Sequence, residues 1–206
     1  MDFAARRDAL VDRLTEREDL DAATEAAMRA VPREAFVPED VRDRAYQDTP
    51  LAIGEGQTIS APHMVAIMTD LLALEPGMDV LEIGTGCGYH AAVTAEVVGA
   101  EGVASVEYHE RLADSARATL EAEGYGDVSV RVGDGKAGWP AQAPFDRAYL
   151  TCAASKLPTD VVEQVRPGGV VLAPVGDDSQ RLVRATRRAD GSLEREDHGG
   201  VRFVPL

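Results

Sequence analysis

From Met78 onward, short runs rich in β-branched residues alternate with segments of helical pattern. The β-rich runs cover residues 79–83, 103–107, 128–132, 145–151 and 170–174. The helical patterns between them cover residues 89–98, 111–123 and 157–165. Gly99, Gly124 and Gly168 stand where helix ends favour a residue that tolerates positive φ. This alternation predicts an α/β fold in which right-handed crossovers build a doubly wound, mostly parallel sheet.

The two flanks of the chain depart from this rhythm. Residues 1–76 carry apolar positions at near-helical spacing, interrupted by Pro32 and Pro38, and predict a helical extension rather than a sheet. Residues 180–188, the turn after them and the run to Leu206 predict an antiparallel pair at the edge of the sheet. Because no repeat or linker separates these parts, we expect one domain, with residues 1–76 packed over a ligand crevice of the 77–206 core.

Composition excludes several classes of function. The 36 acidic residues outweigh the 21 basic ones, which opposes a nucleic-acid partner because such binding depends on clustered Lys and Arg. The 2 cysteines and 4 histidines show no metal-ligand spacing, so no metal is expected. There is no recognisable export signal, and no apolar stretch is long enough to span a bilayer. We expect a cytoplasmic monomer without a membrane partner.

The negative charge also predicts adaptation to high salt. A formal net charge of -15 on one small domain repels itself and destabilises the compact state, a lever that halophilic proteins use. Salt screens this repulsion, because the Debye length falls from about 10 Å at 0.1 M to about 3 Å at 1 M. The alternative is an acidic mesophilic protein.

A glycine-rich loop follows the first predicted strand. Glu82 lies in the strand, and the loop reads Gly84-Thr85-Gly86-Cys87-Gly88. The dinucleotide fingerprint needs its third glycine three positions after the second, where this chain has Tyr89. Gly-x-Gly-x-Gly after an acidic residue instead resembles the first motif of class I methyltransferases. For a glycine cluster alone, an ordinary tight turn is the alternative.

Two later strand ends support a cofactor site. Glu107 ends the second predicted strand, where a carboxylate can accept hydrogen bonds from both ribose hydroxyls. Asp134-Gly135 follows the third, where methyltransferases place an acidic residue near the adenine amino group. Each alone would be a solvated strand end or a simple turn. In register with the glycine loop, they predict a site for S-adenosylmethionine.

The most specific stretch covers residues 45–64 and reads AYQDTPLAIGEGQTISAPHM. With matching motifs at 80–89, 133–135, 138–139, 143–146, 167–169, 174–176 and 201–206, the chain resembles the protein-L-isoaspartate (D-aspartate) O-methyltransferase family over nearly its whole length. The Gly-Gln-Thr-Ile-Ser segment carries most of this resemblance, because generic methyltransferases lack it.

The resemblance implies methyl transfer from S-adenosyl-L-methionine to the free carboxylate of L-isoaspartyl residues, with D-aspartyl residues as a second acceptor. The substrates would be damaged proteins and peptides, whose repair begins through a succinimide. Residues 1–76 would cover the substrate site and residues 77–206 would bind the cofactor. The family's catalytic serine maps to Ser60. The implied cofactor-binding residues are Thr58, Ile59, Glu82, Gly84, Thr85, Gly86, Gly88, Glu107, Tyr108, Asp134 and Gly135.

A serine suits this chemistry. The acceptor carboxylate is already ionised at pH 7, so its attack on a methyl group needs no general base. It needs alignment and a donor that steers one oxygen, which a hydroxyl can supply. The alternative for Ser60 is a helix cap, because Ser-Ala-Pro-His opens the helical run 64–72. His63, in the first turn of that run, is expected to be a solvated or packing residue.

Two rival functions stay open at this point. A methyltransferase for a small molecule or for tRNA would share the cofactor motifs, although the acidic balance opposes an RNA acceptor. A noncatalytic cofactor-binding module would also share them, although Ser60 beside intact cofactor motifs opposes it.

Overall fold

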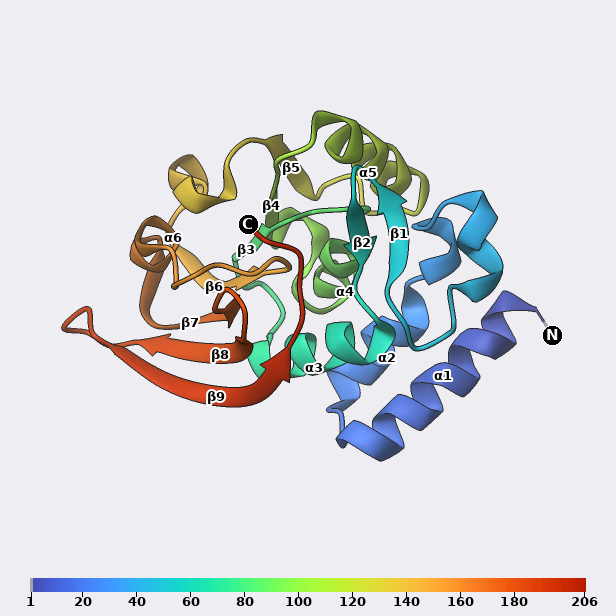
Figure 1. The fold of residues 1–206 in the computed structure, drawn as a ribbon, viewed down its shortest axis with the longest axis horizontal. Coiled ribbons are helices and arrows are strands. Elements are labelled where there is room, and N and C mark those ends of the chain that lie inside the picture. The colour runs from blue at the N-terminus through green and yellow to red at the C-terminus, as the bar shows by residue number, and fades with distance from the viewer. Residues whose placement is uncertain (1) are drawn as a thin grey trace.

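The computed structural model describes residues 2–206 and contains a large mixed sheet covered by helices (Figure 1). The sheet has 7 strands in the order β5-β4-β3-β6-β7-β8-β9. Its strands are β3 (Val80–Ile83), β4 (Val103–Glu107), β5 (Ser129–Val132), β6 (Phe145–Leu150), β7 (Val165–Val175), β8 (Gln180–Arg187) and β9 (Leu193–Val201). The five strands β3, β4, β5, β6 and β7 are parallel to one another. Strand β8 pairs antiparallel with β7, and β9 pairs antiparallel with β8. The predicted fold class and its antiparallel edge are therefore confirmed.

The helices lie on both faces of this sheet. They are α1 (Phe3–Glu18), α2 (Ala22–Ala30), α3 (Pro62–Leu72), α4 (Tyr89–Val98), α5 (Glu110–Ala122) and α6 (Thr159–Glu163). Short 3-10 turns are η1 (Arg33–Ala35), η2 (Glu39–Arg44), η3 (Ala100–Gly102), η4 (Gly135–Ala137) and η5 (Pro140–Gln142). Gly99 and Gly124 have φ of 97° and 89° at the ends of α4 and α5, as the sequence predicts.

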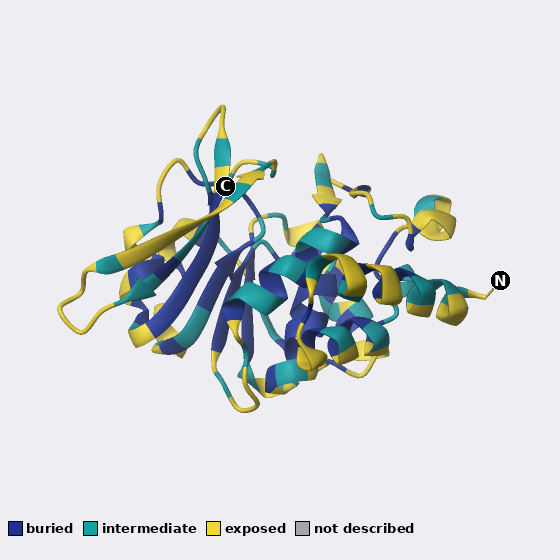
Figure 2. Ribbon diagram, turned by 90° about the horizontal axis from the view of Figure 1, so that it is seen from below, coloured by how far each residue is buried: buried dark blue, intermediate teal, exposed yellow. Residues whose placement is uncertain are grey.

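Strand β3 shows how the two faces of the sheet are used. Val80 packs in the hydrophobic cluster that α1 to α5 form on one face. Leu81 and Ile83 pack in the cluster on the opposite face, with α6 and the chain's last residues. This division follows from the alternation of side chains along a strand. Figure 2 shows the central strands mostly dark blue between the covering layers, as expected for parallel strands buried on both faces, whereas the edge strands β5 and β9 are intermediate or exposed.

Residues 1–76, predicted to be helical without a sheet, contain a β-hairpin. Strands β1 (Leu51–Gly54) and β2 (Gln57–Ile59) pair antiparallel, so the prediction of no sheet in this region is wrong. The Gly-Glu-Gly turn between them has φ of 95°, 50° and 72°, a backbone that glycine adopts readily. Leu51 and Ile53 alternate in burial with their neighbours, which is the period of a strand and not of a helix.

A second correction concerns residues 157–165. The helix there is only α6, which ends at Glu163, and Gly168 lies inside β7 rather than at a helix end. The reason is that β7 begins early: Val165 pairs with Phe145, and a register shift precedes the pairing of Val170 with Arg147. Among residues 2–206, no helix is long and apolar enough to cross a membrane.

Candidate active site

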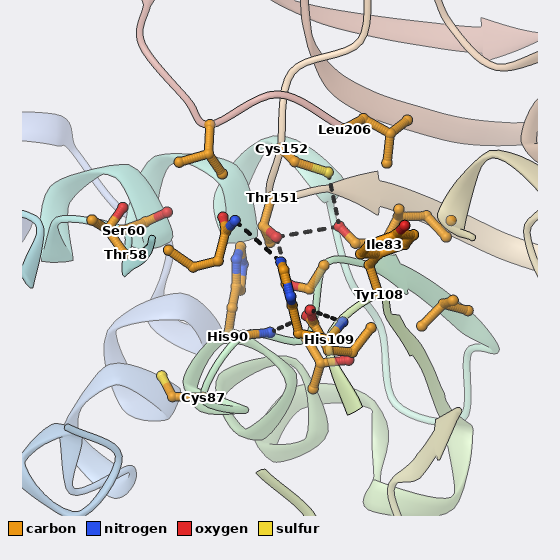
Figure 3. Close-up of a pocket in the computed structure, with 18 of the residues that line it drawn as sticks. Thr58, Ser60, Ile83, Cys87, His90, Tyr108, His109, Thr151, Cys152 and Leu206 are labelled. Atoms are coloured by element: carbon orange, nitrogen blue, oxygen red, sulfur yellow. Dashed lines mark hydrogen bonds between the residues drawn. The ribbon is translucent and has the colours of Figure 1, made fainter. Parts of the chain in front are cut away.

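A cavity of about 460 Å³ opens at the carboxyl ends of the parallel strands. It lies where the strand order reverses between β3 and β6, the switch point at which ligands bind in open α/β sheets. Its walls are residues 57–60, 83–87, 106–109, 134–136, 151–152 and 204–206, with Ile53, Val65, Tyr89 and His90. Figure 3 shows Thr58 and Ser60 on one side of this cavity and Ile83 and Tyr108 on the other.

The glycine loop lies where β3 passes into α4. Gly84 has φ of 96°, and a Cβ atom there would overlap Thr151 Oγ1. Thr151 Oγ1 donates to the Gly84 carbonyl at 2.5 Å. Helix α4 begins after Gly88 without a side-chain cap, so its first amide groups and the positive end of its dipole face the loop. The loop can therefore approach a ligand through its backbone.

Glu107 ties this loop to the end of β4. Its carboxylate accepts from the Gly86 amide at 2.8 Å through one oxygen and from the His109 amide at 2.9 Å through the other. The side chain is buried yet reaches the cavity wall. Each carboxylate oxygen has a further lone pair that can accept from a ligand hydroxyl. The expected juxtaposition of Glu107 with the glycine loop is thus present.

Asp134 and Gly135 occupy the cavity wall after β5. The Asp134 carboxylate accepts from the Lys136 amide at 2.9 Å and caps η4. A Cβ atom on Gly135 would overlap Ile83 Cγ2, so only glycine fits there without rearrangement. Tyr108 is 73% exposed at the edge of the cavity, and its ring meets His109 edge-on with centroids 5.4 Å apart.

Glu82 does not line the cavity, which corrects the expectation that it contacts the cofactor. Because side chains alternate along β3, Ile83 faces the cavity and Glu82 points to the opposite face, where it is completely buried. Its carboxyl group accepts from Tyr149 Oη at 2.9 Å and bonds to Ser105 Oγ. Ser105 Oγ lies 2.6 Å from Thr85 Oγ1. Through Ser105, Glu82 thus supports Thr85 of the glycine loop. Burial raises the pKa of Glu82 to about 8.

Gly88 is the other expected cofactor residue outside the cavity wall. Its φ is 89°, and a Cβ atom would lie 3.2 Å from Leu120 and 3.5 Å from Ala116. Gly88 therefore lets α4 pack closely on α5. Thr58, Ile59, Ser60, Gly84, Thr85, Gly86, Glu107, Tyr108, Asp134 and Gly135 all lie in the cavity wall.

Ser60 stands between β2 and α3. Residue Ala61 caps α3 without a side-chain hydrogen bond, so the alternative that Ser60 caps this helix is wrong. The Ser60 carbonyl accepts from Arg33 Nη2 at 2.7 Å. Ser60 lines both the cavity and an adjoining groove of about 830 Å³. The groove also includes His63 and Arg202. The cavity and the groove share Ser60, Thr58, Thr151 and Val204 in their walls.

His63, which the sequence predicts to be a solvated or packing residue, lies in the wall of the groove and is hydrogen-bonded to Asp48. Its Nδ1 lies 2.8 Å from Asp48 Oδ1, and its backbone amide donates to the same oxygen at 2.9 Å. Arg17 Nη2 donates to the other oxygen of Asp48 at 3.0 Å. Although partial burial raises the pKa of Asp48, the bonds from His63 and Arg17 outweigh it and hold the pKa below its usual range. His63 is thus an oriented side chain in the groove wall.

Several residues of the cavity wall were not predicted from the sequence. Thr151 and Cys152 follow β6, and they could have been found from the rule that ligands bind at carboxyl strand ends. Leu206 lines the cavity because its amide donates to the Ala153 carbonyl at 2.8 Å, while the Ala153 amide donates to the Val204 carbonyl at 2.7 Å. No local pattern signals that long-range pairing. Within the described part of the chain, no group of three or more His, Cys, Asp or Glu could hold a metal ion.

The strand order, the antiparallel edge and a glycine loop bonded to a strand-end glutamate are together the architecture of class I, S-adenosylmethionine-dependent methyltransferases, and this chain is one of them. A solved protein-L-isoaspartate O-methyltransferase superposes with a TM-score of 0.90 at 29% identity. That match covers 97% of this chain and 65% of the solved one.

The chain belongs to the protein-L-isoaspartate(D-aspartate) O-methyltransferase family, whose model matches residues 5–206. It is 51% identical to protein-L-isoaspartate O-methyltransferase 2 of Archaeoglobus fulgidus, a match that covers 100% of this chain and 94% of that protein. It is also 51% identical to the protein-L-isoaspartate O-methyltransferase of Methanopyrus kandleri, over 99% of this chain and 92% of that protein. The family that the sequence motifs resemble is therefore confirmed.

Proposed function

We infer that this chain transfers a methyl group from S-adenosylmethionine to the free carboxylate of L-isoaspartyl residues in damaged proteins and peptides. Its family membership supports the reaction. One observation of the structure carries the inference: residues 57–60, from the segment that generic methyltransferases lack, close the same cavity that the glycine loop and Glu107 line. The site that holds the methyl donor therefore adjoins the segment specific to this family.

The residues present fit the methyl donor. A cavity of about 460 Å³ is within the range of small-molecule sites. We propose that Glu107 accepts from the ribose hydroxyls, that Asp134 lies near the adenine amino group, and that the loop from Gly84 to Gly86 holds the amino-acid end. The close packing at Gly84 and Gly135 supports this, because a side chain at either position would alter the wall. S-adenosylmethionine, when bound, supplies an electrophilic methyl group on sulfonium.

The acceptor side needs orientation more than proton transfer. A carboxylate is ionised at neutral pH and needs no base to act as a nucleophile. We propose that the Ser60 hydroxyl donates to one carboxylate oxygen and leaves the other directed at the methyl group. The adjoining groove, with His63 in its wall, would hold the peptide on either side of the isoaspartyl residue. Ile53 from the hairpin and Leu206 from the tail line the cavity, and we propose that these apolar side chains help to exclude water from it.

Methylation starts repair because it creates a leaving group. The backbone nitrogen of the following residue attacks the ester carbonyl, its proton leaves with the methoxy group as methanol, and a succinimide forms. Water then opens the ring at either carbonyl, so part of the product is normal aspartate. The remainder is methylated again, and repeated cycles convert it.

Labelled methyl transfer tests this function. An isoaspartyl peptide should become labelled, and the matched aspartyl peptide should not. Label that appears only on RNA or on a small molecule would support the rival acceptors. Cofactor binding without transfer to any acceptor would support the noncatalytic module.

We also propose that the chain acts as one domain, with residues 1–76 covering the substrate site and residues 77–206 binding the cofactor. The hydrophobic cluster that α1, α2 and α3 share with the sheet supports the single domain. Adaptation to high salt is a further proposal, supported by the net charge of -15. The monomeric state and the cytoplasmic location stay predictions of the sequence.

A further inference from the structure

Arg33 is a completely buried arginine behind the acceptor side of the cavity. It begins η1, just after α2. Its Nε donates to the Ala45 carbonyl at 2.9 Å, and its Nη2 donates to the Ser60 carbonyl at 2.7 Å. One guanidinium group therefore bridges two backbone positions that are far apart in the sequence.

The charge of Arg33 is unusual for its surroundings. Across residues 2–206, no carboxylate forms an ion pair with it, and its Nη1 is buried without a hydrogen-bond partner. The guanidinium lies 4.9 Å from the ring centroid of Tyr89, which lines the cavity. Burial lowers the pKa of Arg33, but a guanidinium stays protonated in proteins. A buried cation without a counter-ion is destabilising unless its bonds offset the loss of hydration.

The two carbonyls that Arg33 holds enclose the hairpin segment. Ala45 and Ser60 flank residues 46–59, which contain β1 and β2. Four residues of that segment line the cavity: Ile53, Gln57, Thr58 and Ile59. Tyr46 and Asp48 also tie the start of the segment, through Glu34 and through His63 and Arg17. Within the hairpin itself, residues 51–59, the polar side-chain contacts with the core are weak, since Gln57 Nε2 lies 3.4 Å from His109 Nε2 and Glu55 pairs with an Arg111 side chain that is 89% exposed.

We propose that Arg33 is a positioning residue for methyl transfer: its guanidinium fixes both ends of the hairpin segment and thereby sets where Ser60 stands in the cavity. This proposal rests on the proposed function. The planar guanidinium donates in two directions at once, whereas a lysine ammonium is a single point on a flexible stem. Lysine at position 33 keeps the charge but cannot hold Ala45 and Ser60 together in the same geometry.

Arg147 provides a matched control. It also donates to two backbone carbonyls, from Nε to Leu72 at 2.6 Å and from Nη2 to Ala73 at 3.1 Å. These carbonyls lie at the far end of α3, and neither Arg147 nor its partners line the cavity. Arg147→Lys removes a guanidinium that also bonds two carbonyls, here on adjacent residues, without touching the acceptor side.

The experiment compares Arg33→Lys with Arg147→Lys by two readouts. For labelled methyl transfer to an isoaspartyl peptide, Arg33→Lys should lower kcat at saturating substrates by about tenfold or more, because misalignment of the acceptor is felt in the transition state. Arg147→Lys should stay within about twofold of the parent. Amide hydrogen exchange of residues 51–59 should become about tenfold faster in Arg33→Lys alone.

The outcomes separate this proposal from the proposed function. If the parent chain methylates the peptide and Arg33→Lys matches Arg147→Lys in kcat and in exchange, Arg33 is not a positioning residue. If the parent chain does not methylate the peptide, the proposed function fails, and the exchange of residues 51–59 still decides whether Arg33 holds the hairpin. Arg33→Gln is the second variant. Should both Arg33 variants unfold while Arg147→Lys folds, Arg33 is a folding determinant and the proposal is overturned.

Discussion

The two sides of the cavity are built in different ways. On the donor side, residues 84–87, 107–109 and 134–136 lie at or just after the carboxyl ends of parallel strands whose backbones are paired in register. On the acceptor side, residues 57–60 belong to or follow a hairpin outside that sheet. Buried side chains, such as Ile53 and Ile59, and the bonds of Arg33 hold this hairpin in place.

This difference explains which side of the cavity can be shared among methyltransferases and which can be particular to one family. A sheet ladder places strand ends accurately whatever the surface residues are, so the donor side can be common to many methyltransferases. A hairpin held by side chains can be replaced without disturbing the sheet, so the acceptor side can be particular to one family. Changes to the donor side should therefore alter cofactor affinity, and changes to the acceptor side should alter turnover.

The largest effect is expected for Gly84→Ala on the donor side. The new Cβ would overlap Thr151 Oγ1 at a φ of 96°, and strain plus overpacking should weaken cofactor affinity by about 3 kcal/mol or more. Titration calorimetry with S-adenosylhomocysteine measures this. Gly191→Ala is the control, because its φ is 83° but open space surrounds it. Equal affinities for the two variants would contradict the close packing of the loop.

Glu82→Gln tests the support beneath the donor side through pH. Burial raises the pKa of Glu82 to about 8 from 4.5, so its stabilising contribution is complete below pH 4.5 and is lost as the pH rises through 8. The free energy of unfolding should fall by a few kcal/mol between pH 5 and pH 8 in the parent chain. Denaturant titrations should show less of this fall in Glu82→Gln than in the exposed control Glu101→Gln. Identical pH profiles would mean that Glu82 is ionised in the folded state.

Glu107→Ala should weaken S-adenosylmethionine affinity by about 1.5–3 kcal/mol, the range for hydrogen bonds to a charged group. The variant also loses the acceptor for the Gly86 amide, so the loop should become less ordered. Calorimetry on the folded variant measures the affinity, and the exposed Glu110→Ala serves as the control. Unchanged affinity would remove Glu107 from the donor side.

Ser60→Ala should separate the two sides of the cavity most sharply. Loss of the hydroxyl that orients the acceptor should lower kcat by roughly tenfold, or about 1.4 kcal/mol, while cofactor affinity stays nearly intact. The melting temperature should also stay unchanged, because Ser60 does not cap α3. Steady-state kinetics and thermal melts check these expectations. Normal turnover with a lower melting temperature would contradict the proposed role.

The smallest expected effect is that of salt on the melting temperature, and it concerns both sides of the cavity together. Screening of the net charge of -15 should stabilise the chain between 0.1 M and 2 M KCl, with activity following. A gain of about 1 kcal/mol corresponds to a rise of roughly 2–4 °C in melting temperature for a domain of this size. Thermal melts across the salt range measure it. A flat or falling melting temperature would end the halophile proposal and leave the methyltransferase assignment intact.

Local patterns in the sequence were enough to predict the sheet and most of the donor side. Strand runs, glycine positions and the acidic residues at strand ends all express short-range physics, namely the period of side-chain burial and the backbone freedom of glycine. Glu107, Asp134 and the loop at Gly84 are examples, because each is identified by its place at or just after the end of a predicted strand. The family motif around Ser60 extended this reading to the acceptor side.

Tertiary structure alone decided which distant segments meet. The sequence did not show that Leu206 reaches the cavity through Ala153, or that Arg33 joins Ala45 to Ser60. Nor did it show that Glu82 points away from the cavity. Alternation along the strand puts Glu82 and Ile83 on opposite faces of the sheet, but only the packing of the other elements decides which face borders the cavity. Such pairings gain their free energy from burial and hydrogen bonds between remote residues, and a local window of sequence contains neither partner's surroundings.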